Sequence, residues 1–183
     1  MIDVSNFEIK NGVLLNYSGN DSSVKIPSNV IVIDEDAFSY CTSIKSIIIP
    51  NSVKVIGDRA FEGCTRLKSI KIPNSVIEIG YGVFYNCTSL VSVKLPNSIT
   101  IIDDKMFYDC KSLKSVIIPS SVKIISSYAF SHCSNLTTVI IPDSVTKIGN
   151  NAFWNCTSLT DITIPDSVES IGEHAFYNTP INI

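Results

Sequence analysis

A proline returns every 23 residues along most of this chain. A phenylalanine keeps the same interval, and in six of the seven copies a cysteine follows it three residues later. A unit of this length is too short to bury its own apolar side chains, so neighbouring units must stack around a shared core. The chain is therefore expected to form a solenoid. The repeated positions are Pro27, Pro50, Pro73, Pro96, Pro119, Pro142 and Pro165, then Phe38, Phe61, Phe84, Phe107, Phe130, Phe153 and Phe176, and Cys41, Cys64, Cys87, Cys110, Cys133 and Cys156.

The unit from residue 49 to 71, IPNSVKVIGDRAFEGCTRLKSIK, indicates how one coil folds. Near its end, polar and apolar residues alternate, with Ile70 facing inward and Ser69 and Lys71 outward, which predicts a short strand. Pro73 ends that strand because proline cannot donate to a sheet ladder. The RAFEG stretch is short and mixed, which favours one helical or 3₁₀ turn. Stacked in register, the strands of successive units form a parallel sheet.

Composition narrows the class of protein. Hydrophobic residues make up 45% of the 183 residues and charged residues only 17%, which fits one domain with a large core. The net charge of −3 does not indicate a nucleic-acid partner. Residues 1–6, MIDVSN, lack the basic and apolar regions of a signal peptide. We expect no membrane insertion, because no apolar run approaches the roughly 18 residues of a spanning helix.

The consensus LxxIxIPxSVxxIGxxAFxxC resembles the BspA-type leucine-rich repeat, with Leu67, Ile70 and Ile72 as the strand signature. The resemblance covers nearly the whole chain. It implies an α/β solenoid, a right-handed stack with a parallel β-sheet on its concave side and short strands with 3₁₀ or short helical turns on its convex side. It also implies protein or ligand binding, since some members are bacterial or protozoan surface proteins that attach to host components. No catalytic residues come with it.

The two ends depart from the repeat. Residues 1–25 are expected to form an N-terminal capping hairpin, because Asn11-Gly12 separates two alternating runs and favours a type I′ turn. Residues 26–183 hold the seven repeats, of which the last is incomplete, and an open sheet edge at this end predicts self-association. The side chains expected to cover the first coil are Phe7, Ile9, Val13, Leu15 and Tyr17.

The cysteines invite several interpretations. Zinc sites use closely spaced pairs, whereas here one thiol recurs per coil, and the two histidines, His132 and His174, lie in different columns. Stacked coils bring equivalent Cα atoms within reach of a disulfide, but bonding two of six would strain the repeat. A dyad of His132 with Cys133 is disfavoured because adjacent side chains point in different directions. We therefore expect a ladder of buried, reduced thiols and no metal or other cofactor.

Function in such a stack depends on positions that the repeat itself does not require. Outward strand positions are basic in the N-terminal and middle coils and become apolar and hydroxyl-rich later, which favours an interface for a partner with an acidic surface. The alternative is an ordinary exposed sheet rich in serine and threonine. The candidate binding residues of this concave face are Lys45, Lys68, Lys71, Lys94, Lys114, Ile117, Thr138, Ile140 and Thr163.

The residue after each repeated phenylalanine is variable and often aromatic. Because serine and glutamate also occur there, the fold does not demand aromatic side chains, and tyrosine and tryptophan are favoured interface anchors. The alternative is that these rings pack over the neighbouring coil. The candidate aromatic rim consists of Tyr85, Tyr108, Trp154 and Tyr177.

These observations favour a non-enzymatic protein-binding module that uses the concave face. The alternative is a cell-surface adhesin for host or matrix components, tethered by a segment outside this sequence. An enzyme is disfavoured because no acid, base and nucleophile converge. The compartment stays open, since unpaired cysteines favour a reducing compartment such as the cytoplasm, whereas the family resemblance allows the cell surface.

Overall fold

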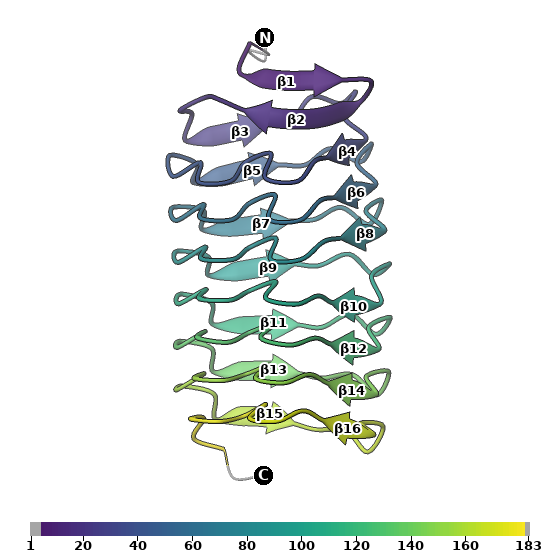
Figure 1. Ribbon diagram of the computed structural model, residues 1–183, viewed down its shortest axis with the longest axis vertical. Coiled ribbons are helices and arrows are strands. Elements are labelled where there is room, and N and C mark those ends of the chain that lie inside the picture. The colour runs from purple at the N-terminus through teal and green to yellow at the C-terminus, as the bar shows by residue number, and fades with distance from the viewer. Residues whose placement is uncertain (1–4, 182–183) are drawn as a thin grey trace.

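The computed structural model describes residues 5–181 and is a stack of coils that runs along one axis from the N-terminal to the C-terminal end (Figure 1). Residues 1–4 of the predicted cap and residues 182–183 of the last repeat lie outside the described residues. Each repeat contributes one strand of three residues and one of two. The chain is thus a solenoid, as the repeat predicts, but a β-solenoid and not the α/β solenoid that the resemblance implies.

The three-residue strands are β3 (Ser23–Lys25), β5 (Ser46–Ile48), β7 (Ser69–Lys71), β9 (Ser92–Lys94), β11 (Ser115–Ile117), β13 (Thr138–Ile140) and β15 (Asp161–Thr163). The two-residue strands are β4 (Val32–Ile33), β6 (Val55–Ile56), β8 (Glu78–Ile79), β10 (Ile101–Ile102), β12 (Ile124–Ile125), β14 (Lys147–Ile148) and β16 (Ser170–Ile171). Both sets pair in parallel, coil upon coil.

Register follows the 23-residue repeat, because Ser69 lies opposite Ser92 and Lys71 opposite Lys94. In β7 the middle residue, Ile70, is buried and its two neighbours are exposed. The same pattern of inward and outward residues holds in β3, β5 and β11. The predicted strand positions and their alternation are therefore confirmed.

The N-terminal hairpin consists of β1 (Phe7–Lys10) and β2 (Val13–Tyr17), paired antiparallel. Asn11 and Gly12 have φ angles of 52° and 78°, and positive φ at both central residues is the mark of a type I′ turn. β2 continues the ladder of two-residue strands, with Leu14 opposite Ile33.

The predicted alternation along this hairpin is only partly right. Phe7 and Ile9 pack against the core and Tyr17 is buried, but Leu14 is fully buried while Leu15 is only half-buried. The physical reason is the ladder with β4, which requires the residue opposite Ile33 to face the core, and that residue is Leu14.

The helical or 3₁₀ turns that the sequence predicts do not form: residues 5–181 contain no helix. In the stretch around RAFEG, Arg59 and Gly63 have φ angles of 52° and 65°, in the left-handed region, which ends a right-handed helical turn. Backbone N–H groups here alternate between a carbonyl of the same coil and one of the next coil. Glu62 donates to the carbonyl of Arg59, whereas Phe61 donates to the carbonyl of Val83 in the next coil. Backbone bonds that a helix would keep local therefore link the coils.

The core is built from columns of identical or similar side chains. From Phe38 to Phe176 the repeated phenylalanine rings stack with centroid separations of 5.2–5.7 Å. Six of these rings, all except that of Phe176, are no more than 1% exposed. A continuous aromatic stack thus runs along the solenoid.

Both parallel ladders are interrupted between the third and fourth repeats. β8 is not hydrogen-bonded to β10, nor β9 to β11, so each ladder divides into two sheets. We call these two breaks the seam. Val83 and Met106 occupy a column that holds alanine in the other repeats, and the ring separations flanking Phe84 are the largest, 5.7 and 5.5 Å. The backbone beside these residues still bridges the two coils, since Phe84 donates to the carbonyl of Met106 at 2.9 Å, so the seam is confined to the strands.

Candidate functional site

The candidate binding residues lie on one surface, which we call the strand face: the outward side chains of the three-residue strands and the residue just before each strand. Because the strands pair in register, equivalent residues of successive coils line up about 4.8 Å apart. All nine predicted residues lie on this face, and all are exposed except Thr138, which is half-buried. They are Lys45, Lys68, Lys71, Lys94, Lys114, Ile117, Thr138, Ile140 and Thr163.

One column of the strand face combines charge with apolar surface. Lys71 and Lys94 are register partners on β7 and β9, and Ile117 and Ile140 are partners on β11 and β13. The two isoleucines are 73% and 60% exposed and, as register partners, form a contiguous apolar patch. The column is thus cationic in its first half and apolar in its second.

Two further exposed apolar residues belong to the same surface and are missing from the predicted set. Ile48 is 57% exposed and lies next to Lys25 in the column that also holds Lys71. Val91 is 39% exposed and lies between Lys68 and Lys114 in the repeat. The sequence signal for both is their position: each occupies an outward position equivalent to those of the predicted lysines. The alternation of the strand does not require an apolar residue at either position.

The lysines of the strand face form no ion pair with any acidic residue that the structure describes. Within residues 5–181, the ion pairs lie elsewhere and join Arg59 to acidic residues of the turns and Lys111 to Asp109. Like charges side by side on a sheet are destabilising. The side-by-side pair Lys71 and Lys94 therefore favours the approach of a negatively charged group.

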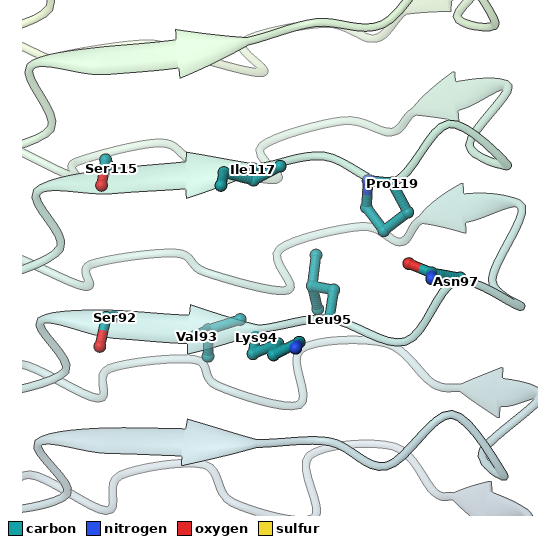
Figure 2. A pocket seen from close by; sticks show the side chains of 8 residues that line it. All are labelled: Ser92, Val93, Lys94, Leu95, Asn97, Ser115, Ile117 and Pro119. Carbon is teal, nitrogen blue, oxygen red and sulfur yellow. The ribbon is translucent and has the colours of Figure 1, made fainter.

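Two grooves open on this face, and both include Lys94. The first, of about 440 Å³, lies between β9 and β11, where the sheet is interrupted, and is mainly apolar (Figure 2). The second, of about 530 Å³, has a more polar lining that includes Lys71. Both volumes fall in the range of ligand pockets.

Three residues of the candidate aromatic rim contact rings of neighbouring coils, whereas Tyr177 contacts His174 of its own coil. Tyr85 and Tyr108 stack with their centroids 4.9 Å apart. Trp154 packs edge-on against His132, which also contacts Tyr108. Three of the four are half-buried, and only Tyr177 is largely exposed. These contacts are those of rings that pack over the next coil, and whether the rim also binds a partner stays a prediction.

Three aromatic neighbours of the rim lay outside the predicted set. Tyr81 accepts a hydrogen bond of 3.2 Å from Lys105, which raises the pKa of the lysine. The ammonium of Lys105 also lies 5.9 Å from the ring centre of Tyr128, within the range of cation–π attraction. Tyr40, 62% exposed, donates to the carboxylate of Glu62. They were missed because they belong to other columns of the repeat.

The cysteines form a buried ladder of free thiols. Each thiol from Cys64 onward is inaccessible and donates to the carbonyl of a phenylalanine in the preceding coil, at 3.1–3.2 Å. Cys41 is half-buried and makes a longer contact, 3.7 Å, with the carbonyl of Tyr17. Burial raises the pKa of Cys156 to about 12 and also raises that of the other thiols. The thiols thus serve packing and backbone hydrogen bonding.

We expect the folded protein to resist thiol reagents. The reactive species is the thiolate, and burial both excludes the reagent and suppresses ionisation. At pH 8 a chromogenic disulfide reagent should modify at most one thiol, Cys41, in the native protein and all six after unfolding in guanidinium. Rapid modification of two or more native thiols would contradict the buried ladder.

Groups that could support metal binding or acid–base chemistry do not converge in the part of the chain that the structure describes. No cluster of three or more His, Cys, Asp or Glu side chains there could hold a metal ion. The Nδ1 atom of His132 lies 3.0 Å from the side-chain nitrogen of Asn155, and the thiol of Cys133 is directed to the carbonyl of Phe107. The two adjacent residues therefore do not form a dyad.

Among residues 5–181 we find no helical segment with the length and hydropathy of a membrane span.

Sequence comparison identifies the repeat. The family model described as BspA type leucine rich repeat region (6 copies) matches two overlapping ranges, residues 8–137 and 78–183. The chain belongs to the BspA-type leucine-rich repeat family. Its members are generally scaffolds that bind other proteins and not enzymes. No curated protein matches this BspA-type chain.

Solved BspA-like solenoids share its architecture. A leucine-rich repeat protein from Eubacterium ventriosum is 30% identical, with a TM-score of 0.89, over 95% of this chain and 48% of its own length. A leucine-rich repeat protein from T. pallidum is 34% identical, with a TM-score of 0.86, over 92% and 82%. A leucine-rich cell surface protein from Faecalibacterium prausnitzii is 26% identical, with a TM-score of 0.55, over 80% and 61%. This chain thus spans about half the length of the first of these proteins.

Proposed function

We propose that this protein is a non-enzymatic module that binds another protein through its strand face, which we expect to be the concave face of a right-handed solenoid. The observation that carries the proposal is the column Lys71, Lys94, Ile117 and Ile140. Exposed apolar side chains of this size, flanked by unpaired charges, are what the centre and rim of an interface use. The partner's surface is expected to be acidic.

The proposal is tested by capture with two baits. The first bait is the native chain, and the second is the strand-face variant, Lys71→Glu, Lys94→Glu, Ile117→Ser and Ile140→Ser. We expect mass spectrometry of material retained from an extract of the source organism, or of its host, to find a protein held by the first bait and absent from the second. Equal retention by both baits would contradict the proposal.

A second candidate function is that of a cell-surface adhesin. It is supported by the similar protein from F. prausnitzii, which is described as a leucine-rich cell surface protein. Antibodies against this chain should then label intact cells of the source organism. Labelling only after the cells are made permeable would exclude the adhesin and leave the protein-binding module unaffected. Self-association through the last coil is a separate prediction, tested by the sedimentation of the purified chain.

A further inference from the structure

The two grooves of the strand face differ in chemistry and share one residue. The polar groove is lined by Lys71 and Lys94 together with the side-chain amides of Asn51 and Asn74. The apolar groove takes Lys94 as its edge and continues over Leu95 and Ile117. A cationic site and an apolar site thus lie side by side, with Lys94 between them.

The apolar groove exists because of the seam. β9 and β11 are not hydrogen-bonded, and Val93, in the middle of β9, is half-buried where its equivalent Val116 is only 2% exposed. Position 95 also differs from its equivalents, because it holds leucine where every other repeat carries isoleucine. Figure 2 shows Leu95 in the space between β9 and β11, with Pro119 across from it. The groove is therefore a feature of this one coil and not of the repeat.

The polar groove favours a carboxylate. Lys71 and Lys94 lie in adjacent register positions, both exposed and neither in an ion pair within the described residues. A negative group between them relieves their mutual repulsion. Asn51 and Asn74 also line this groove, and the Asn74 side-chain oxygen accepts from the N–H of Asn97, which leaves its NH₂ group as a donor.

The distance between the grooves suits residues of a peptide that are two positions apart. Successive strands lie about 4.8 Å apart, and each groove spans one strand-to-strand interval, so the groove centres are separated by about one such interval. In an extended peptide, successive side chains point to opposite faces, and side chains two residues apart share a face about 6.8 Å apart along the chain. The flexible side chains of Lys71 and Lys94 can make up the difference between these two distances.

We propose that the strand face recognises an extended peptide segment with an acidic side chain two residues from a bulky apolar side chain, the acid at Lys71 and Lys94 and the apolar group in the groove at Leu95 and Ile117. This inference rests on the proposed function and adds the chemistry of the partner. The peptide crosses the strands, along the solenoid axis, where the strand face changes from cationic to apolar.

A library of random 12-residue peptides displayed on phage tests the inference. We expect the enriched peptides to pair Asp or Glu with Leu, Ile, Phe or Trp two positions away. For the best peptide, labelled for fluorescence anisotropy, Lys94→Glu and Ile117→Ser should each weaken binding at least 10-fold. Raising NaCl from 0.05 to 0.5 M should weaken the native complex to a similar degree, because salt screens the carboxylate contact. The matched controls Lys54→Glu and Ile101→Ser, also exposed but on the side of the two-residue strands, should leave it unchanged.

The outcomes separate this inference from the proposed function. The inference would be overturned if the library gave no enriched peptides or enriched peptides without the acidic–apolar pair. It would also be overturned if the face bound heparin, a polyanion, and this binding did not need Ile117. The proposed function survives those results if the captured protein still requires the strand face. It fails with the inference if the strand-face variant retains the native partner.

Discussion

Phe107→Ala is expected to lower the free energy of unfolding by about 3–5 kcal/mol, the cost of a large cavity in a close-packed core. The Phe107 ring is fully buried and stacks on Phe84 at 5.5 Å and on Phe130 at 5.2 Å, so one substitution removes two ring contacts. For a chain of this size the melting temperature should fall by about 6–20 °C. Differential scanning calorimetry or guanidinium unfolding followed by circular dichroism measures the change.

Two variants make this prediction falsifiable. Phe176→Ala should cost clearly less, because that side chain is only partly buried and its ring stacks on Phe153 alone within residues 5–181. Phe107→Leu keeps much of the volume and should remain folded, with a smaller loss. If Phe107→Ala changed stability by less than about 1 kcal/mol, the stacked phenylalanines would not be the structural centre of the solenoid.

Much of this fold follows from the sequence alone, because the repeat forces equivalent residues into columns. The strand at Ser69–Lys71, its inward Ile70 and the turn at Asn11-Gly12 could all be predicted from alternation and turn chemistry. Once the strands are in register, the exposed column of lysines and isoleucines follows without further information.

The turns could not be predicted as easily. Glycine and asparagine, which favour positive φ, occupy some of the left-handed positions, as at Gly63, Asn86 and Asn151, but Arg59, Lys105 and Tyr128 occupy others. Local composition therefore suggested a helical turn. The observed conformation is selected by hydrogen bonds to the next coil, which a single unit does not reveal.

The candidate site was predicted in outline and missed in detail. Its lysines and isoleucines are visible in the columns, but the repeat pattern gives no sign of the seam between β8 and β10 and between β9 and β11. The groove beside Leu95 depends in turn on that seam. Likewise the contacts of Tyr108 with His132 and of Lys105 with Tyr81 join columns that alignment of the repeat treats separately.

The strand-face variant should bind its partner about 100-fold more weakly than the native chain, or worse. Removing two exposed isoleucines from an interface centre and reversing two lysines that face an acidic surface should together remove about 3 kcal/mol or more, and each 1.4 kcal/mol is tenfold. Folding should be intact, since substitutions of exposed side chains usually change stability by less than about 0.5 kcal/mol each. The melting curve of the variant checks this first.

Isothermal titration of the captured partner into three proteins tests the central claim: the native chain, the strand-face variant and a matched control. The control, Lys54→Glu, Ile77→Ser, Ile101→Ser and Lys123→Glu, has the same change in composition and charge among exposed residues on the side of the two-residue strands. We predict native affinity for the control and a loss of about 100-fold for the strand-face variant. Equal affinity of all three proteins, or a loss confined to the control, would contradict a binding role for the strand face.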